Sequence, residues 1–134
     1  MIKFAKSWIA QLFIKRIEKN NKLILINKLG NDNSLLGTPI EILQTLDTIR
    51  NFVNRDLTLI DIGAHKGLFS LAASKCFNLK EIYCFEPNTE FHNIIKERIN
   101  RSSLFVSDIA LGNEKGLKPF FFHPSVPLGI QILG

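Results

Sequence analysis

An aspartate and two glycines follow an apolar run in the middle of the chain, where residues 57–67 read LTLIDIGAHKG. The run is typical of a buried strand, and Gly63 and Gly67 frame the turn that follows it. Glycine adopts backbone angles that other residues avoid and leaves room for a ligand beside the main chain. The free N–H groups that begin the next helix attract a carboxylate or a phosphate. The stretch therefore predicts an anion-binding loop with a carboxylate, Asp61, ahead of it.

A second acid, Glu86, closes the next apolar segment, EIYCFE at 81–86. A carboxylate at the end of such a strand can accept hydrogen bonds from the two hydroxyls of a ribose. A tight turn would explain one glycine, but not two glycines together with both acids. The glycine loop and Glu86 together predict a nucleoside cofactor.

The loop sequence GAHKG also indicates which nucleoside to expect. It lacks the central glycine of GxGxxG, which lets a helix N-terminus approach a pyrophosphate, and this disfavours a dinucleotide. It fits S-adenosylmethionine, whose carboxylate would face the loop amides and whose ammonium would face an acid such as Asp61.

The elements that position these residues alternate along the chain. TPIE at 38–41 predicts a capping box that starts a helix. LTLIDI has no polar alternation, which predicts a strand buried on both faces. LFSLAASKCF and TEFHNIIKERIN have helical spacing, and SLFVS at 103–107 is a third strand. The order strand, helix, strand, helix, strand predicts a parallel βαβαβ unit of an α/β, Rossmann-like, doubly wound fold.

Positive charge is concentrated at the N-terminus. Residues 1–28 carry seven basic groups against one acid, whereas the rest is nearly neutral, which argues against a nucleic-acid surface spread over the fold. The segment predicts an amphipathic helix with Phe4, Trp8, Leu12 and Phe13 on one stripe. We expect this stripe to cover the domain or its missing part; contact of residues 1–28 with an anionic membrane surface is the alternative.

Domain organisation follows from this pattern. GNDNSLLG at 30–37 is a polar connector, so residues 1–37 form a basic helix with its connector and residues 38–134 form the cofactor-binding domain. Cys76 and Cys84 lie in apolar stretches without CxxC spacing, which favours free thiols in a reducing cytoplasm over a metal site.

Three segments, LIDIGAHKGLFSLAAS, IYCFEPNTEFHNIIKERI and DIALGNEKG with the following KPFFF, resemble the FkbM-type family of S-adenosylmethionine-dependent methyltransferases over about residues 57–122. The resemblance implies methyl transfer to a hydroxyl of a sugar or another small molecule. The resemblance implies cofactor contacts for Asn88 and Asp108. The alternative for Asn88 is a helix cap, and the alternative for Asp108 is a turn residue. The implied cofactor contacts are Asp61, Gly63, Ala64, His65, Gly67, Glu86, Pro87, Asn88, Asp108 and Ile109.

The chain also departs from the family. Family members continue to a fourth strand and an acceptor pocket, whereas this sequence stops at PLGIQILG. We therefore expect a sheet that is incomplete after its third strand and a short β extension, with an exposed edge prone to self-association. No catalytic base is identifiable. An inactive nucleoside-binding remnant is the alternative function, and a nicotinamide-binding module is disfavoured by the loop.

Overall fold

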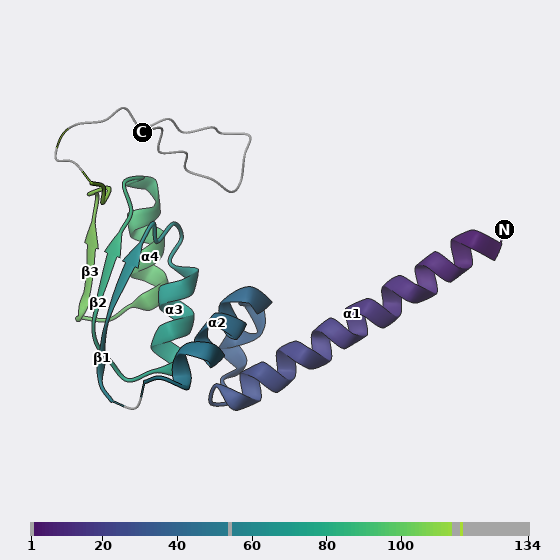
Figure 1. Cartoon of the computed structure of the whole chain (residues 1–134). Helices are drawn as coiled ribbons and strands as arrows, with labels where there is room; N and C mark the ends of the chain where they lie inside the picture. Colours follow the sequence, from purple (N-terminus) through teal and green to yellow (C-terminus); the bar gives the residue numbers. More distant parts are fainter. Residues whose placement is uncertain (1, 54, 114–115, 117–134) are drawn as a thin grey trace.

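A three-stranded parallel sheet forms the centre of the computed structural model, which describes residues 2–53, 55–113 and 116. The strands β1 (Leu57–Ile62), β2 (Leu79–Phe85) and β3 (Leu104–Ser107) lie in the order β1-β2-β3. Helix α3 (Leu68–Cys76) links β1 to β2, and α4 (Glu90–Ile99) links β2 to β3; both lie on the same side of the sheet (Figure 1). The predicted α/β class and element order are confirmed.

The register of the sheet sorts its residues between two faces. Asp61 of β1 pairs with Cys84 of β2, on the face that α3 and α4 cover. Ile60 and Ile62 point to the other face, where they are 59% and 62% exposed. The prediction that LTLIDI is buried on both faces is therefore wrong for this structure. Within the described residues, helices cover one face of β1 only, so its burial alternates.

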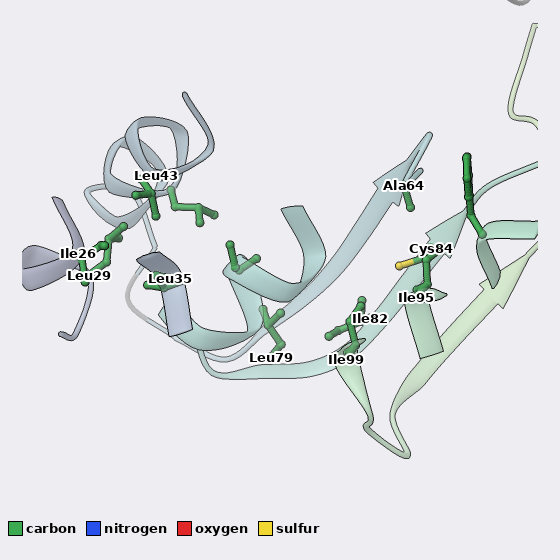
Figure 2. Packing of buried hydrophobic residues seen from close by; sticks show 14 residues of the cluster. Ile26, Leu29, Leu35, Leu43, Ala64, Leu79, Ile82, Cys84, Ile95 and Ile99 are labelled. Carbon is green, nitrogen blue, oxygen red and sulfur yellow. The ribbon is translucent and has the colours of Figure 1, made fainter. Parts of the chain in front are cut away.

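One hydrophobic cluster joins the helical layer to the sheet (Figure 2). Burial of these side chains removes apolar surface from water and is the main force that holds the helices on the sheet. The cluster includes side chains from α1 (Ile2–Lys28), the 3₁₀ helix η1 (Asn33–Gly37) and α2 (Ile40–Arg50) as well as from the βαβαβ unit. Its buried members are Ile26, Leu29, Leu35, Leu43, Leu46, Ala64, Ala72, Ala73, Leu79, Ile82, Cys84, Phe91, Ile95 and Ile99.

Helix α2 (Ile40–Arg50) forms where it is predicted, but its start differs from the predicted capping box. The backbone N–H of Thr38 donates to the carbonyl of Leu35 at 2.9 Å, because Thr38 ends a 3₁₀ helix, η1 (Asn33–Gly37), within the expected connector. Pro39 occupies the N-cap position of α2, and no side-chain hydrogen bond caps the helix. The side chain of Thr38 is buried instead of capping α2.

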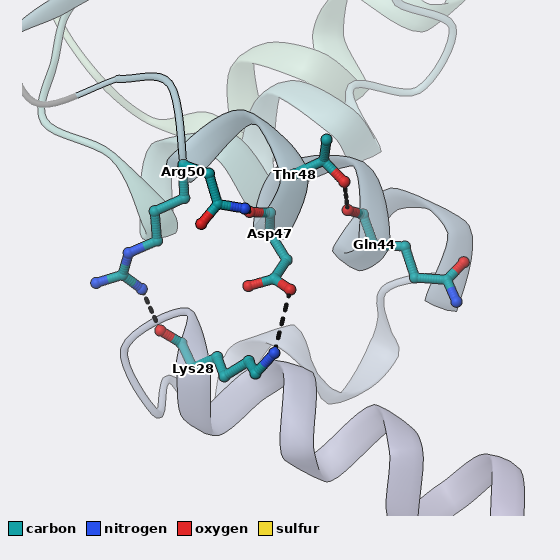
Figure 3. Close-up of polar contacts among 6 residues, drawn as sticks. Lys28, Gln44, Asp47, Thr48 and Arg50 are labelled. Atoms are coloured by element: carbon teal, nitrogen blue, oxygen red, sulfur yellow. Dashed lines mark hydrogen bonds and ion pairs between the residues drawn. The ribbon is translucent and has the colours of Figure 1, made fainter.

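Helix α1 (Ile2–Lys28) is attached to the domain by its C-terminal end and extends away from it (Figure 1). Ile26 is 1% exposed in the core. Figure 3 shows two polar contacts at the same end: Nζ of Lys28 lies 3.5 Å from Oδ2 of Asp47, and the guanidinium of Arg50 donates to the carbonyl of Lys28. The junction of α1 with α2 is therefore both apolar and polar.

The outer part of α1 does not cover the domain. Leu12, one residue of the predicted stripe, is 48% exposed and so does not pack against the described part of the domain. The side chains of Phe4, Trp8 and Phe13 lie outside the described part, as do the aromatic segment KPFFF and the β extension. In the described ranges, none of the helices has the length and apolar character needed to cross a membrane.

Candidate functional site

The loop between β1 and α3 combines three residues with positive φ. Gly63 has φ +75°, His65 +50° and Gly67 +72°. A Cβ built on Gly63 would meet nothing within 4 Å, so the main chain there borders open space. A Cβ on Gly67 would lie 3.2 Å from Cγ1 of Ile95, so this glycine lets α3 start close to α4. The two glycines thus differ in their surroundings: Gly63 borders open space, whereas Gly67 allows close packing of α3 against α4.

The main chain of this loop is tied to the end of β2. The N–H groups of Gly63 and Ala64 both donate to the carbonyl of Phe85, at 2.8 and 3.1 Å. The N–H of Gly67 donates to the carbonyl of Ala64 at 2.7 Å. These amides are therefore already used within the protein. The N-cap of α3 at Gly67 carries no side-chain hydrogen bond.

Glu86 lies directly beside this loop, where its position after β2 brings it. Its Oε2 accepts the N–H of His65 at 2.7 Å, and its Oε1 accepts the N–H of Asn88 at 2.8 Å. The residue has no exposed surface. The carboxylate thus joins the turn after β1 to the turn after β2, and the structure brings together the two sequence features that predict a nucleoside site.

Asp61 and Ser70 form a second polar pair behind the loop. The hydroxyl of Ser70 donates to Oδ2 of Asp61 at 2.6 Å and lies 3.3 Å from Sγ of Cys84. Desolvation raises the pKa of Asp61 above its usual value, although hydrogen bonds from Ser70 oppose the shift and the nearby Glu86 adds to it. Burial therefore favours the neutral form of this carboxyl group.

His65 faces α4 as well as Glu86. Its ring meets Phe91 edge-on with ring centroids 4.4 Å apart, and Nζ of Lys66 lies 5.6 Å from the Phe91 centroid. Desolvation and the charge of Lys66 lower the pKa of His65, while Glu86 partly opposes them. The guanidinium of Arg98 donates to the carbonyl of Lys66 at 2.9 Å. Helix α4 thus holds the loop in place, and a neutral imidazole is favoured near pH 7.

The remaining predicted residues lie at the same edge of the sheet but differ in their contacts and their exposure. Oδ1 of Asn88 accepts the N–H of Glu90, the first residue of α4, at 3.1 Å, whereas Thr89 occupies the N-cap position and makes no side-chain cap bond. Pro87 is half-buried between Glu86 and Asn88. Asp108 and Ile109 are exposed after β3, and the Ile109 N–H lies 3.3 Å from the hydroxyl of Ser107. This contact ties the residues after β3 into a local turn.

Two residues near the site were not singled out from the sequence. Ser70 is completely buried and orients Asp61, but a serine in the first turn of a helix gives no signal of such a contact. A ring nitrogen of His92 lies 2.6 Å from the carbonyl of Glu86. His92 lies over the end of β2 because α4 packs there, and the sequence alone does not show this packing.

The arrangement supplies a carboxylate at the end of each of two neighbouring strands, a glycine with open space above it and a loop at the carboxyl edge of a parallel sheet. Ligands of open α/β sheets bind at this edge. No group of three His, Cys, Asp or Glu residues able to hold a metal occurs in the part that the structure describes. Comparison of the chain with protein-family models, curated proteins and solved structures found no significant match.

Proposed function

We propose that the chain binds S-adenosylmethionine at the carboxyl edge of its sheet, as the cofactor-binding part of a methyltransferase that acts on a hydroxyl of a sugar or another small molecule. One observation carries the proposal: the carboxylate of Glu86 lies 2.7 Å from the main chain of the glycine loop, at the His65 N–H. An acid suited to a ribose and a glycine loop are thereby adjacent at the carboxyl edge of the sheet, where ligands of such folds bind.

Each proposed contact has a physical basis. Gly63 borders open space, so the methionine part of the ligand can approach the main chain there. Burial raises the pKa of Asp61, and a ligand ammonium beside it would favour the ionised carboxylate and so offset this shift. Glu86 would turn from His65 toward the ribose, exchanging bonds to amides for bonds to hydroxyls. Because Glu86 is buried, binding requires this side chain to move.

S-adenosylmethionine supplies an activated methyl group on a sulfonium. The contribution of this chain to the transfer would be to hold that methyl group in place for the acceptor oxygen, since proximity and alignment account for much of such catalysis. A base that removes the acceptor proton is not assigned among the described residues.

An inactive nucleoside-binding remnant would retain the same ligand contacts without turnover, so binding and activity must be measured separately. A nicotinamide-binding module is the less favoured alternative, because GAHKG lacks the central glycine of the dinucleotide fingerprint. Methyl transfer from radiolabelled cofactor to a panel of sugars distinguishes the enzyme from the remnant.

The experiment that tests the site is calorimetric titration of the full chain with S-adenosylhomocysteine and with adenosine. Glu86→Ala removes the proposed ribose contact, so it should weaken both ligands at least about tenfold, which corresponds to about 1.4 kcal/mol. Asp61→Asn keeps an acceptor for Ser70 but removes the charge, so it should weaken S-adenosylhomocysteine and leave adenosine unchanged.

Glu97→Ala is the matched control, because Glu97 is an exposed glutamate on α4. It should bind both ligands as the native chain does. Circular dichroism must show that each variant is folded at the temperature of the titration. Native-like affinity of folded Glu86→Ala for both ligands would contradict the assignment of the ribose contact.

A further inference from the structure

The outer part of α1 has apolar side chains that no described residue covers. Ile14, Ile17 and Ile24 are 55%, 57% and 55% exposed, although each would gain from leaving water. Ile17 and Ile24 are separated by two helical turns and therefore lie on one side of the helix. We call Ile14, Ile17 and Ile24 the isoleucine side of α1.

The opposite side of α1 is basic and turned toward the domain. Lys15, Lys19 and Lys22 line a groove of about 560 Å³ that α1 forms with residues of η1 and α2, including Leu36 and Ile40. The isoleucine side does not contribute to this groove. Glu18 and Leu23 line the groove beside the lysines. The isoleucine side thus lies outside the groove, while the C-terminal end of α1 is fixed by Ile26 and by the contacts of Lys28 (Figure 3).

Such a helix needs a partner to gain stability. With 27 residues it is about 40 Å long, and an isolated helix in water owes little of its stability to propensity alone. The partner must cover isoleucines and must also tolerate basic neighbours: seven basic residues and one acid lie within residues 1–28. We propose that α1 binds the surface of an anionic lipid bilayer, with the isoleucine side in the interface and the basic residues near the headgroups.

The charge and the apolar side chains of α1 distinguish an anionic bilayer from two other partners, a second copy of the chain and a nucleic acid. A second copy of the chain would bring another helix of the same positive charge against the first, whereas anionic headgroups are complementary to it. A nucleic acid would complement the charge, but its phosphates would leave the isoleucine side uncovered. An anionic lipid surface complements the positive charge of α1 and also covers its isoleucine side.

Flotation of the full chain with vesicles tests the proposal, because bound protein rises with the vesicles whereas aggregated protein sinks. The chain should float with vesicles that contain about one third phosphatidylserine and remain behind with pure phosphatidylcholine; added salt should reduce flotation. Ile17→Asp with Ile24→Asp should lower the bound fraction at least tenfold. Lys19→Gln with Lys22→Gln should weaken binding by at least about fivefold, by the electrostatic attraction of each lysine.

The matched control is Ile60→Asp with Ile62→Asp, which alters exposed isoleucines of the sheet and should leave vesicle binding unchanged. Circular dichroism and thermal unfolding should show all three double variants to be folded. The proposal would be overturned by equal binding to neutral vesicles or by native-like flotation of the α1 isoleucine variant. It would also be overturned if the native chain did not bind vesicles but formed an oligomer that only the α1 isoleucine variant disrupted. A shift of a DNA or RNA probe without vesicle binding would also overturn it.

Discussion

Glu86 and His65 are joined by a 2.7 Å hydrogen bond between a buried carboxylate and a main-chain N–H, across the gap between β2 and the loop after β1. The other carboxylate oxygen accepts the N–H of Asn88. His65 has a positive φ of 50°, which is unfavourable for a residue with a side chain. The bond thus helps to hold a strained loop in the form that this structure shows.

Glu86→Gln should therefore destabilise the fold even without a ligand. A glutamine can accept one of the two N–H groups, but its own NH₂ group would face the other donor. Leaving a buried donor without a partner costs about 1–3 kcal/mol. Urea denaturation followed by circular dichroism measures this cost, with the exposed Glu97→Gln as control. Equal stability of the two variants would show that the Glu86 bonds contribute nothing to folding.

Gly67→Ala should be more destabilising than Gly63→Ala. Both substitutions force alanine into a left-handed conformation, at a cost of roughly 1–2 kcal/mol. Only at Gly67 does the new Cβ also come within 3.2 Å of Cγ1 of Ile95, so the Ile95 side chain must move slightly to make room. Denaturant midpoints of the two variants give the comparison directly. If Gly63→Ala were the less stable variant, the close contact of Gly67 with Ile95 would not matter energetically.

The raised pKa of Asp61 predicts how Asp61→Asn depends on pH. Burial favours the protonated form in the folded state, so the contribution of this group is fully present below its unfolded pKa, near 3.8. That contribution is lost as the pH rises through the raised folded pKa. Asparagine resembles the neutral carboxyl group and does not ionise, so Asp61→Asn does not lose this stabilisation as the pH rises.

The stability of Asp61→Asn relative to the native chain should therefore improve between about pH 4 and about pH 7. Urea denaturation at several pH values within this range measures the difference. Asp47→Asn, on α2, serves as the control for general effects of charge. A relative stability of Asp61→Asn that falls as the pH rises would mean that the folded-state pKa is lowered instead.

The exposed face of β1 predicts self-association. β1 lies at one end of the described strand order, and the side chain of Ile60, a residue of β1, is more than half exposed. Such an edge can pair with another chain. Ile60→Lys should shift the chain toward the monomer in size-exclusion chromatography with light scattering, whereas Ile24→Lys on α1 should have little effect. A native chain that elutes as a clean monomer would refute this prediction.

The strand and helix order was predictable because apolar runs and helical spacing are local properties of the sequence. The two-sided burial of LTLIDI was not predictable, because whether Ile60 and Ile62 are covered depends on a second layer rather than on β1 itself. The capping box failed for a similar reason: Thr38 is buried at the end of η1 and uses its N–H there.

The site shows the same division. The positions of Asp61, Gly63 and Glu86 follow from the strand ends, which is why the sequence could place them at one edge. The direction of the Glu86 carboxylate depends on which N–H groups its neighbours offer, and Ser70 reaches Asp61 only because α3 packs over β1. Contacts of this kind come from packing, which spacing alone does not specify.

The most direct test of the central claim is calorimetric titration of the native 134-residue chain with S-adenosylhomocysteine and, in a parallel experiment, with NAD. The proposed site predicts saturable binding of one S-adenosylhomocysteine per chain and weaker or undetectable binding of NAD. No heat of binding with S-adenosylhomocysteine for a chain shown to be folded, or tighter binding of NAD, would contradict it.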